Sequence, residues 1–186
     1  SKKIRVVADE CFLRFHPHYE KMSCKRFLTQ YPNLLIVNAF TKFYAMAGLR
    51  LGYLMTGDLS LLHAVAQQLP EWNVSSIAQR AGISALQDTE YEKRTRQLIE
   101  KERRYLIQEF LKMGCTVFPS EADYITFRLP QEKTGFLLKE RLLEGKILIR
   151  SCANYRNMPP DCYRIAVKQH ADNEELVRQV WRILKQ

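Results

Sequence analysis

The sequence predicts an α/β protein built in two parts, and three observations support this fold class. Two short apolar runs typical of buried strands, Ile4–Ala8 and Leu34–Val37, flank a stretch that can form a helix. A long amphipathic segment from about residue 89 to residue 113 predicts a helix that ends at Gly114. Beyond it, strand and helix patterns alternate again, which indicates a second, smaller α/β unit.

The first part begins with a strand, a helix and a strand. Ile4–Ala8 predicts a buried strand that stops at Asp9, and Leu34–Val37 predicts a second one. Between them, Ser23 can cap a short helix that ends near Gln30. Strands joined by a right-handed crossover are parallel, so their carboxyl ends lie at one edge of the sheet. Residues that follow the two strands therefore become neighbours at that edge, where open α/β sheets bind ligands.

The remainder of the first part is predicted to hold a further strand and two helices. Leu51–Met55 follows the second strand too closely for a crossover and should pair with it in the antiparallel direction. Asp58 can begin an apolar-periodic helix that Pro70 ends, and Ser75 or Ser76 can cap the next helix. A parallel strand needs neighbours, and nothing upstream of the first strand provides them. We therefore expect this chain to be the C-terminal part of a longer protein.

The second part is predicted from shorter patterns. Its expected strands are Cys115–Phe118, Tyr124–Leu129, Ile147–Arg150 and Tyr163–Val167, with helices near 133–144 and 173–185. We expect three regions along the chain. Residues 1–88 would form the larger domain, residues 89–114 a linking helix, and residues 115–186 a small C-terminal domain.

Composition narrows the class of protein. A chain of 186 residues can bury a sizeable core, and no apolar run is long enough to span a bilayer. The first twenty residues lack the order of a signal peptide. The five cysteines are odd in number and have no paired metal-ligand spacing, so we expect reduced thiols, no metal site and a cytoplasmic protein.

The net charge of +9 is compatible with an acidic ligand or with nucleic acid. The densest basic run, residues 93–104, is interleaved with Glu90, Glu92, Glu100 and Glu109, a mixture typical of the solvated face of a helix. No helix-turn-helix pattern, zinc spacing or aromatic platform accompanies it. We therefore expect no nucleic-acid partner and no membrane partner.

The segment from Asn38 to Tyr53 carries the most specific chemistry in the sequence. Lys42 lies in a short loop after an apolar strand, and Gly48 and Arg50 follow it. This order suits an aldehyde cofactor that carries a phosphate, with Lys42 condensing with the aldehyde and Arg50 holding the phosphate. Most loop lysines are simply solvated. Here the flanks are almost wholly apolar, which argues against that interpretation.

Three sequence segments together resemble the fold type I enzymes that use pyridoxal 5'-phosphate. They are Asp9-Glu10-Cys11-Phe12, the stretch Thr41 to Tyr53, and Asn73 to Gln79. Within that group the chain resembles the aminotransferase class I/II family over essentially its whole length. The similar branch holds threonine-phosphate decarboxylases and histidinol-phosphate aminotransferases. The resemblance implies the C-terminal part of this fold, with part of a mostly parallel large-domain sheet followed by a small α/β domain.

The resemblance also implies roles at the cofactor. Asp9 would pair with the pyridine nitrogen, and Lys42 would form the Schiff base and then move a proton as acid and base. Arg50 would bind the phosphate, with the Thr41 hydroxyl beside it. Without the resemblance, Asp9 could equally be a turn carboxylate. Phe12 stands near the ring where many relatives have tyrosine, so a hydrogen bond to the cofactor's ring oxygen is lost.

Two arginines of the second part are implied to bind substrate. Arg164 matches the family arginine whose planar guanidinium holds the substrate α-carboxylate through two parallel hydrogen bonds. Taken alone, it could instead pair with a structural carboxylate. Arg150, together with Arg156, is the next candidate, because this segment resembles the decarboxylase branch, which holds a substrate phosphate.

The sequence therefore favours an enzyme that uses pyridoxal phosphate on an amino acid, plausibly a phosphorylated one, and that forms a homodimer. Residues 149–156 favour the decarboxylase, and the aminotransferase is the alternative. A piece of the protein that keeps the fold without activity is a further alternative. A non-catalytic binding domain is disfavoured because Asp9 and Lys42 are both present.

Overall fold

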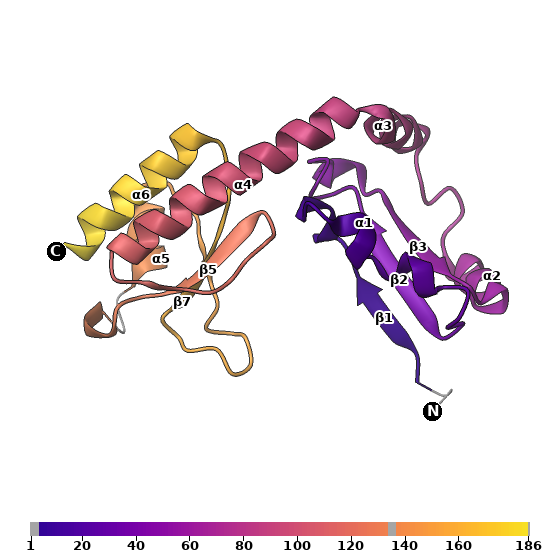
Figure 1. The fold of residues 1–186 in the computed structure, drawn as a ribbon, viewed down its shortest axis with the longest axis horizontal. Helices are drawn as coiled ribbons and strands as arrows, with labels where there is room; N and C mark the ends of the chain where they lie inside the picture. Colours follow the sequence, from indigo (N-terminus) through magenta and orange to yellow (C-terminus); the bar gives the residue numbers. More distant parts are fainter. Residues whose placement is uncertain (1–3, 134–136, 186) are drawn as a thin grey trace. The chain divides into compact units, whose positions relative to one another are not determined.

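The structure is a computed structural model that describes residues 4–133 and 137–185. The chain divides into two compact units, Ser1–Thr95 and Arg96–Gln186. Each unit has its own sheet with helices around it, so the mixed α/β class is confirmed (Figure 1). The boundary between the units falls inside one long helix, α4 (Thr89–Lys112).

The first unit contains a sheet with the strand order β1-β2-β3. The strands are β1 (Val6–Asp9), β2 (Leu34–Ala39) and β3 (Gly52–Thr56). As predicted, β1 runs parallel to β2, with Asp9 opposite Val37, and β3 pairs with β2 in the antiparallel direction. The carboxyl ends of β1 and β2 therefore share one edge.

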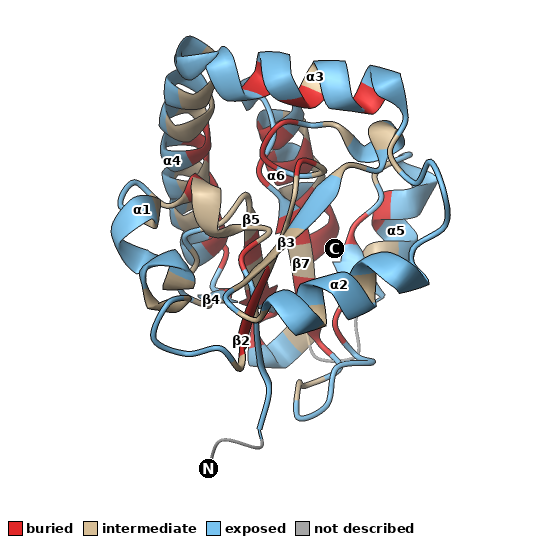
Figure 2. Ribbon diagram, turned by 90° about the vertical axis from the view of Figure 1, so that its right-hand side faces the viewer, coloured by how far each residue is buried: buried red, intermediate tan, exposed pale blue. Residues whose placement is uncertain are grey.

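The expectation that the first strand is buried is wrong. Val6 and Val7 of β1 are 49% and 61% exposed, whereas Ile36 of β2 is fully buried. The reason is position in the sheet, because within the described residues β1 pairs with β2 alone and forms the edge. In Figure 2 the ribbon of β2 is coloured mainly as buried, whereas that of α2 (Leu59–Gln68) is coloured mainly as exposed.

The single helix expected between the first two strands is replaced by short turns. They are the 3-10 helix η1 (Leu13–Phe15), α1 (Tyr19–Met22) and the 3-10 helix η2 (Cys24–Phe27). Ser23 does act as a cap, since its Oγ accepts the Lys25 N–H at 3.2 Å. Its hydroxyl also donates to the buried carboxylate of Glu10, which accepts the Cys24 N–H as well. These bonds hold the chain in a turn at Ser23 and keep the two short helices apart.

The two helices after β3 follow the predicted caps. Asp58 Oδ1 accepts the Leu61 N–H at 3.0 Å and begins α2. Ser75 Oγ accepts the Ala78 N–H at 3.2 Å and begins α3 (Ser76–Gln87). A short 3-10 helix, η3 (Ala47–Leu49), lies within the lysine loop, residues 40–51, which joins β2 to β3 and carries Lys42.

The second unit contains an antiparallel sheet with the strand order β4-β5-β7-β6. The strands are β4 (Thr116–Val117), β5 (Tyr124–Arg128), β6 (Arg150–Ser151) and β7 (Cys162–Ala166). The helices are η4 (Gln131–Lys133), α5 (Leu138–Glu144) and α6 (His170–Leu184). Several bounds differ from the expectations: β4 is shorter, β6 is shorter and shifted to Arg150–Ser151, and α6 begins earlier. Of the helix expected near 133–144, the structure has α5 from Leu138, and residues 134–136 lie outside the described residues.

The start of α6 is set by a buried polar cluster. Asn173 bonds both the N–H and the carbonyl of Lys168, and it donates to Glu102 at 3.0 Å. His170 Nδ1 lies 3.0 Å from the same Glu102 oxygen. These contacts hold the first turn of α6 in place. The sequence prediction used the spacing of apolar residues, which carries no information on these polar contacts, so it began the helix too late.

The core of the second unit forms between α4 and the sheet. Ile99, Leu106 and Phe110 of α4 are buried, and the Phe110 ring centroid lies 4.3 Å from that of Phe127 on β5. Gly114 ends α4 with a φ of 80°, as its position predicted. Within residues 4–133 and 137–185, every helix is too short or too polar to cross a membrane.

Replacing Phe110 by alanine should destabilise the protein by about 3–5 kcal/mol, because the change leaves a cavity against Phe127. Leu111→Ala is the matched control, since Leu111 is the next residue of α4 and is 54% exposed. Its effect should stay within about 0.5 kcal/mol. Denaturant titration of both variants measures the difference, and equal losses would contradict the assignment of this core.

Candidate active site

Asp9 lies at the carboxyl end of β1 with its side chain exposed. Its Oδ1 accepts the Cys11 N–H at 3.0 Å. Hydrogen bonds from the Cys11 thiol and then from its backbone N–H lower the pKa of Asp9, and burial acts in the opposite direction. Asp9 is therefore a carboxylate at neutral pH, and among the described residues no cation forms an ion pair with it.

Cys11 is the partner of this carboxylate. Burial, followed by the hydrogen bond to Asp9 and its charge, raises the pKa of the Cys11 thiol to about 11, while the positive charge of Lys42 acts against the shift. The thiol is thus a neutral donor beside a charged acceptor. No signal in the sequence singled it out, because it is a lone cysteine two residues after Asp9.

Lys42 follows β2 in a loop whose neighbouring side chains are buried. Phe40, Phe43 and Tyr44 are 7%, 2% and 8% exposed, whereas Lys42 is exposed. The Lys42 Nζ lies 5.8 Å from the ring centroid of Phe12. Among the described residues no carboxylate forms an ion pair with Lys42. The loop therefore presents an amine at the edge of the sheet that also carries Asp9.

Arg50 and Gly52 lie at the return of this loop into β3. Arg50 has a left-handed backbone with a φ of 53°, and its exposed guanidinium donates to the Ala47 carbonyl at 3.2 Å. No described carboxylate pairs with it. A Cβ at Gly52 would come within 2.9 Å of the Asn38 carbonyl oxygen, so this position has no room for a side chain. Thr41 is half-buried beside Lys42.

Arg150 and Arg164 lie directly opposite each other on β6 and β7 in the second unit. Like charges in such a cross-strand pair repel. Each guanidinium is placed over an aromatic ring, Arg150 at 5.2 Å from the Tyr155 centroid and Arg164 at 4.9 Å from that of Tyr124. Within the described chain neither forms an ion pair, so the alternative that Arg164 holds a structural carboxylate gains no support.

The structure thus brings the predicted residues together in two groups. Asp9, Phe12 and Lys42 gather in the first unit, with Thr41 and Arg50 on the same loop. Arg150 and Arg164 pair in the second unit. One glutamate behaves differently from its expected place on a solvated helix face. The Glu92 side chain is only 14% exposed, and its Oε1 accepts the Tyr44 hydroxyl at 2.6 Å.

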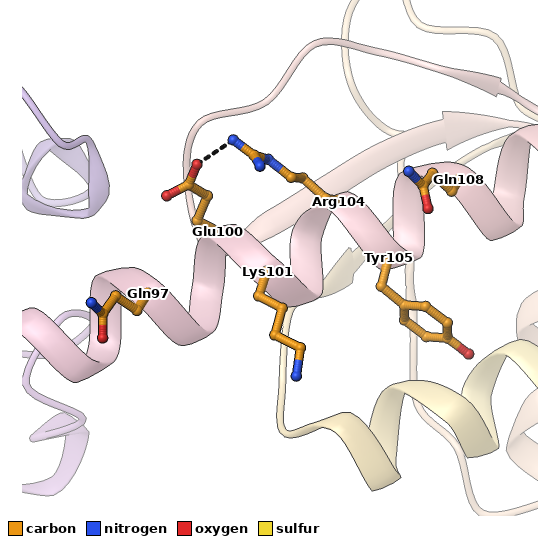
Figure 3. A pocket seen from close by; sticks show the side chains of 6 residues that line it. All are labelled: Gln97, Glu100, Lys101, Arg104, Tyr105 and Gln108. Atoms are coloured by element: carbon orange, nitrogen blue, oxygen red, sulfur yellow. Dashed lines mark hydrogen bonds and ion pairs between the residues drawn. The ribbon is translucent and has the colours of Figure 1, made fainter.

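A shallow hollow of about 420 Å³ lies along α4 in the second unit (Figure 3). Its lining residues are Gln97, Glu100, Lys101, Arg104, Tyr105 and Gln108. Glu100 and Arg104 point to one side of the helix, and Lys101 and Tyr105 point to the other. The hollow contains none of the residues predicted to carry chemistry, and it has no part in the site described above.

The family profile described as aminotransferase class I and II matches residues 1–180. The chain belongs to this family. It is 35% identical over 185 residues to threonine-phosphate decarboxylase from Salmonella typhimurium, covering 99% of this chain and 50% of that protein. It is 32% identical to histidinol-phosphate aminotransferase from Oleidesulfovibrio alaskensis, covering 97% of this chain and 47% of that protein.

A solved structure agrees with these relatives. The histidinol-phosphate aminotransferase from Clostridium acetobutylicum matches with a TM-score of 0.91 and 31% identity, over 99% of this chain and 55% of that one. The chain therefore spans about half the length of the relatives that it matches.

The thiol of Cys11 should be alkylated slowly at pH 8, with a rate that rises toward a midpoint near pH 11. Asp9→Asn removes the negative charge and leaves a weaker, neutral acceptor, so the midpoint should fall and alkylation at pH 8 should accelerate. Iodoacetamide labelling of the cofactor-free protein, followed by peptide mass spectrometry, measures both. Asp58→Asn is the control because that carboxylate caps α2. An unchanged rate in Asp9→Asn would contradict the described contact.

Proposed function

We propose that the complete protein is an enzyme that uses pyridoxal 5'-phosphate on an amino acid, with decarboxylation of a phosphorylated amino acid as the leading reaction. The observation that carries this proposal is the Lys42 amine, which has no carboxylate partner among the described residues and lies at the sheet edge where the ionised Asp9 also lies. Similarity to threonine-phosphate decarboxylases supports the reaction class. Aminotransfer of the histidinol-phosphate type is the alternative, because relatives with that name are also similar.

The residues of the first unit fit the cofactor. Asp9 supplies an anion for a protonated ring nitrogen, and its hydrogen bonds from Cys11 keep it charged. Arg50 supplies N–H donors for the phosphate, with the Thr41 hydroxyl nearby in sequence. Phe12 offers an apolar ring beside Lys42. When bound, the cofactor supplies a protonated ring that stabilises negative charge at the substrate Cα.

The chain's own residues would divide the remaining work. The Lys42 Nζ would bind the aldehyde carbon covalently and, once displaced by the substrate amine, would carry a proton to or from the substrate Cα. Arg164 would hold the substrate α-carboxylate through two parallel hydrogen bonds. Arg150 would supply positive charge for a second anionic group, which explains why two opposed arginines have no carboxylate partner in the described part of the chain.

We also propose a homodimer in the cytoplasm. All five cysteines are unbonded, which supports a reducing compartment. Trp72 and Ile77 are 94% and 71% exposed, which supports burial of this surface against another chain or segment. The division into residues 1–88, 89–114 and 115–186 is kept as a proposal for the domains of the complete protein.

Borohydride reduction of the complete protein loaded with pyridoxal phosphate should add the cofactor mass to Lys42, as peptide mapping would detect. Lys42→Ala should abolish the label because the proposed site assigns the cofactor aldehyde to this amine. Lys168→Ala, which changes an exposed lysine of the second unit, is the control and should label normally. A label on another residue, or none, would overturn the proposal.

The two arginines should separate substrate carboxylate from substrate phosphate. Arg164→Gln should weaken binding of every amino acid by about tenfold to a hundredfold, the loss expected for a charge-assisted hydrogen bond. Arg150→Gln should weaken phosphorylated amino acids selectively. KM values for serine, threonine and their phosphates would be measured together with released carbon dioxide and keto acid. Carbon dioxide without amino transfer supports decarboxylation, and keto acid supports the alternative. Neither product from any phosphorylated amino acid would contradict the substrate class.

A further inference from the structure

Behind the lysine loop, three residues from three separate segments form one polar cluster within the first unit. Arg14 comes from the stretch after β1, Tyr44 from the lysine loop, and Glu92 from the first turn of α4. The Arg14 Nη1 donates to both the Tyr44 hydroxyl oxygen and Glu92 Oε1. The Tyr44 hydroxyl in turn donates to Glu92 Oε1 at 2.6 Å. Each member therefore bonds the other two.

A second contact joins the same turn of α4 to the same loop. The Tyr91 hydroxyl donates to the backbone carbonyl of Phe43 at 3.1 Å. The rings of Tyr44 and Tyr91 are stacked with their centroids 6.1 Å apart. Two consecutive residues of α4 thus hold the two residues that directly follow Lys42.

The cluster is shielded from solvent and balanced in charge. The Arg14 and Glu92 side chains are 22% and 14% exposed, so their hydrogen bonds are partly desolvated. The Arg14 guanidinium also lies 5.3 Å from the Tyr44 ring centroid and 5.9 Å from that of Phe43. Burial, followed by the hydrogen bond to Glu92, raises the pKa of Tyr44, so its hydroxyl stays a donor.

Lys42 itself has no such anchor among the described residues. The contacts of Phe43 and Tyr44 therefore determine where Lys42 lies, because fixing two residues leaves the preceding residue little conformational freedom. Arg14 lies five residues after Asp9, so the cluster also links the segment that carries the carboxylate to the loop that carries the amine. Stability alone would not require these contacts to converge on the two residues after the lysine.

We propose that Arg14, Tyr44, Tyr91 and Glu92 are positioning residues, which fix the Lys42 loop relative to the Asp9 segment so that the amine captures the cofactor aldehyde efficiently. The inference rests on the function proposed for Lys42. It assigns to the first turn of α4 a role in the chemistry, although this turn contributes no side chain to the cofactor.

The test uses the complete protein and the variants Tyr44→Phe, Glu92→Gln and Tyr91→Phe. The measured quantity is the rate at which Lys42 is labelled by pyridoxal phosphate and borohydride, well below the melting temperature. We expect labelling to slow about tenfold for Tyr44→Phe and Glu92→Gln, since the first loses both hydroxyl bonds and the second loses the negative charge that strengthens the bonds from Arg14 and Tyr44. Amide hydrogen exchange at residues 43–46 of the cofactor-free protein should accelerate in the same variants.

Glu90→Gln is the matched control, because Glu90 lies in the same turn of α4 and is exposed. It should label at the wild-type rate. A purely structural role would lower the melting temperature of the variants while leaving the labelling rate and the exchange of residues 43–46 unchanged, and that result would overturn the proposal. If Tyr44→Phe and Glu92→Gln do not fold, the labelling rate of Tyr91→Phe tests the proposal, since this milder change removes only the hydroxyl that bonds the Phe43 carbonyl. A wild-type labelling rate in that variant would overturn the inference.

Failure of the proposed function gives a different result. In that case wild-type protein itself carries no label on Lys42. Hydrogen exchange still reports whether the cluster holds the loop, because that measurement needs no cofactor.

Discussion

The parallel pairing of β1 with β2 is the constraint on which the site depends. It sets Asp9 opposite Val37, so the segment after β1 and the loop after β2 leave the sheet at the same edge. Burial of Leu34, Leu35 and Ile36 stabilises this register, at about 1.5–3 kcal/mol for each fully buried side chain. A slip of one residue would turn every side chain of β2 to the opposite face. The register therefore determines which residues can meet the ligand.

At that edge, buried aromatic rings hold the loop in place, and exposed charged side chains are left to bind a ligand. Phe43 and Tyr44 bury their rings and hold the loop, while Lys42 between them and Thr41 stays exposed. Among the described residues Arg50 donates to one backbone carbonyl and pairs with no carboxylate, so most of its donors stay available. Cations that lack a carboxylate partner in the described chain are costly to gather unless an anion joins them. The arrangement therefore favours an anionic ligand at this edge.

Much of the fold followed from local sequence signals. The cap at Asp58, the helix end at Gly114 and the antiparallel return of β3 were predicted correctly, because each depends on a few neighbouring residues. Ser75 is one of the two caps predicted for α3. The exposure of β1 was not, since burial of a strand depends on what covers it. The segment around Ser23 also differed, because its hydroxyl is bonded to Glu10, thirteen residues earlier. The roles of the site residues came from the family resemblance and stay predictions.

Glu92 and Cys11 show why the environment of the site could not be predicted. A glutamate in a run of mixed charges looks solvated, and only the fold brings Arg14 and Tyr44 to Glu92. The effect of Cys11 likewise depends on a contact, the hydrogen bonds that it donates to Asp9. Because the pKa of the thiol is raised to about 11 and that of Asp9 is lowered, the pair carries one negative charge at neutral pH. A thiolate at Cys11 would be a second anion and would repel a phosphate-bearing ligand. The neutral thiol instead donates a hydrogen bond to Asp9, so Asp9 is the one anion that Lys42 and Arg50 meet in this pair. The negative charge of this pair therefore lies on Asp9, and Cys11 contributes hydrogen bonds that lower the pKa of Asp9.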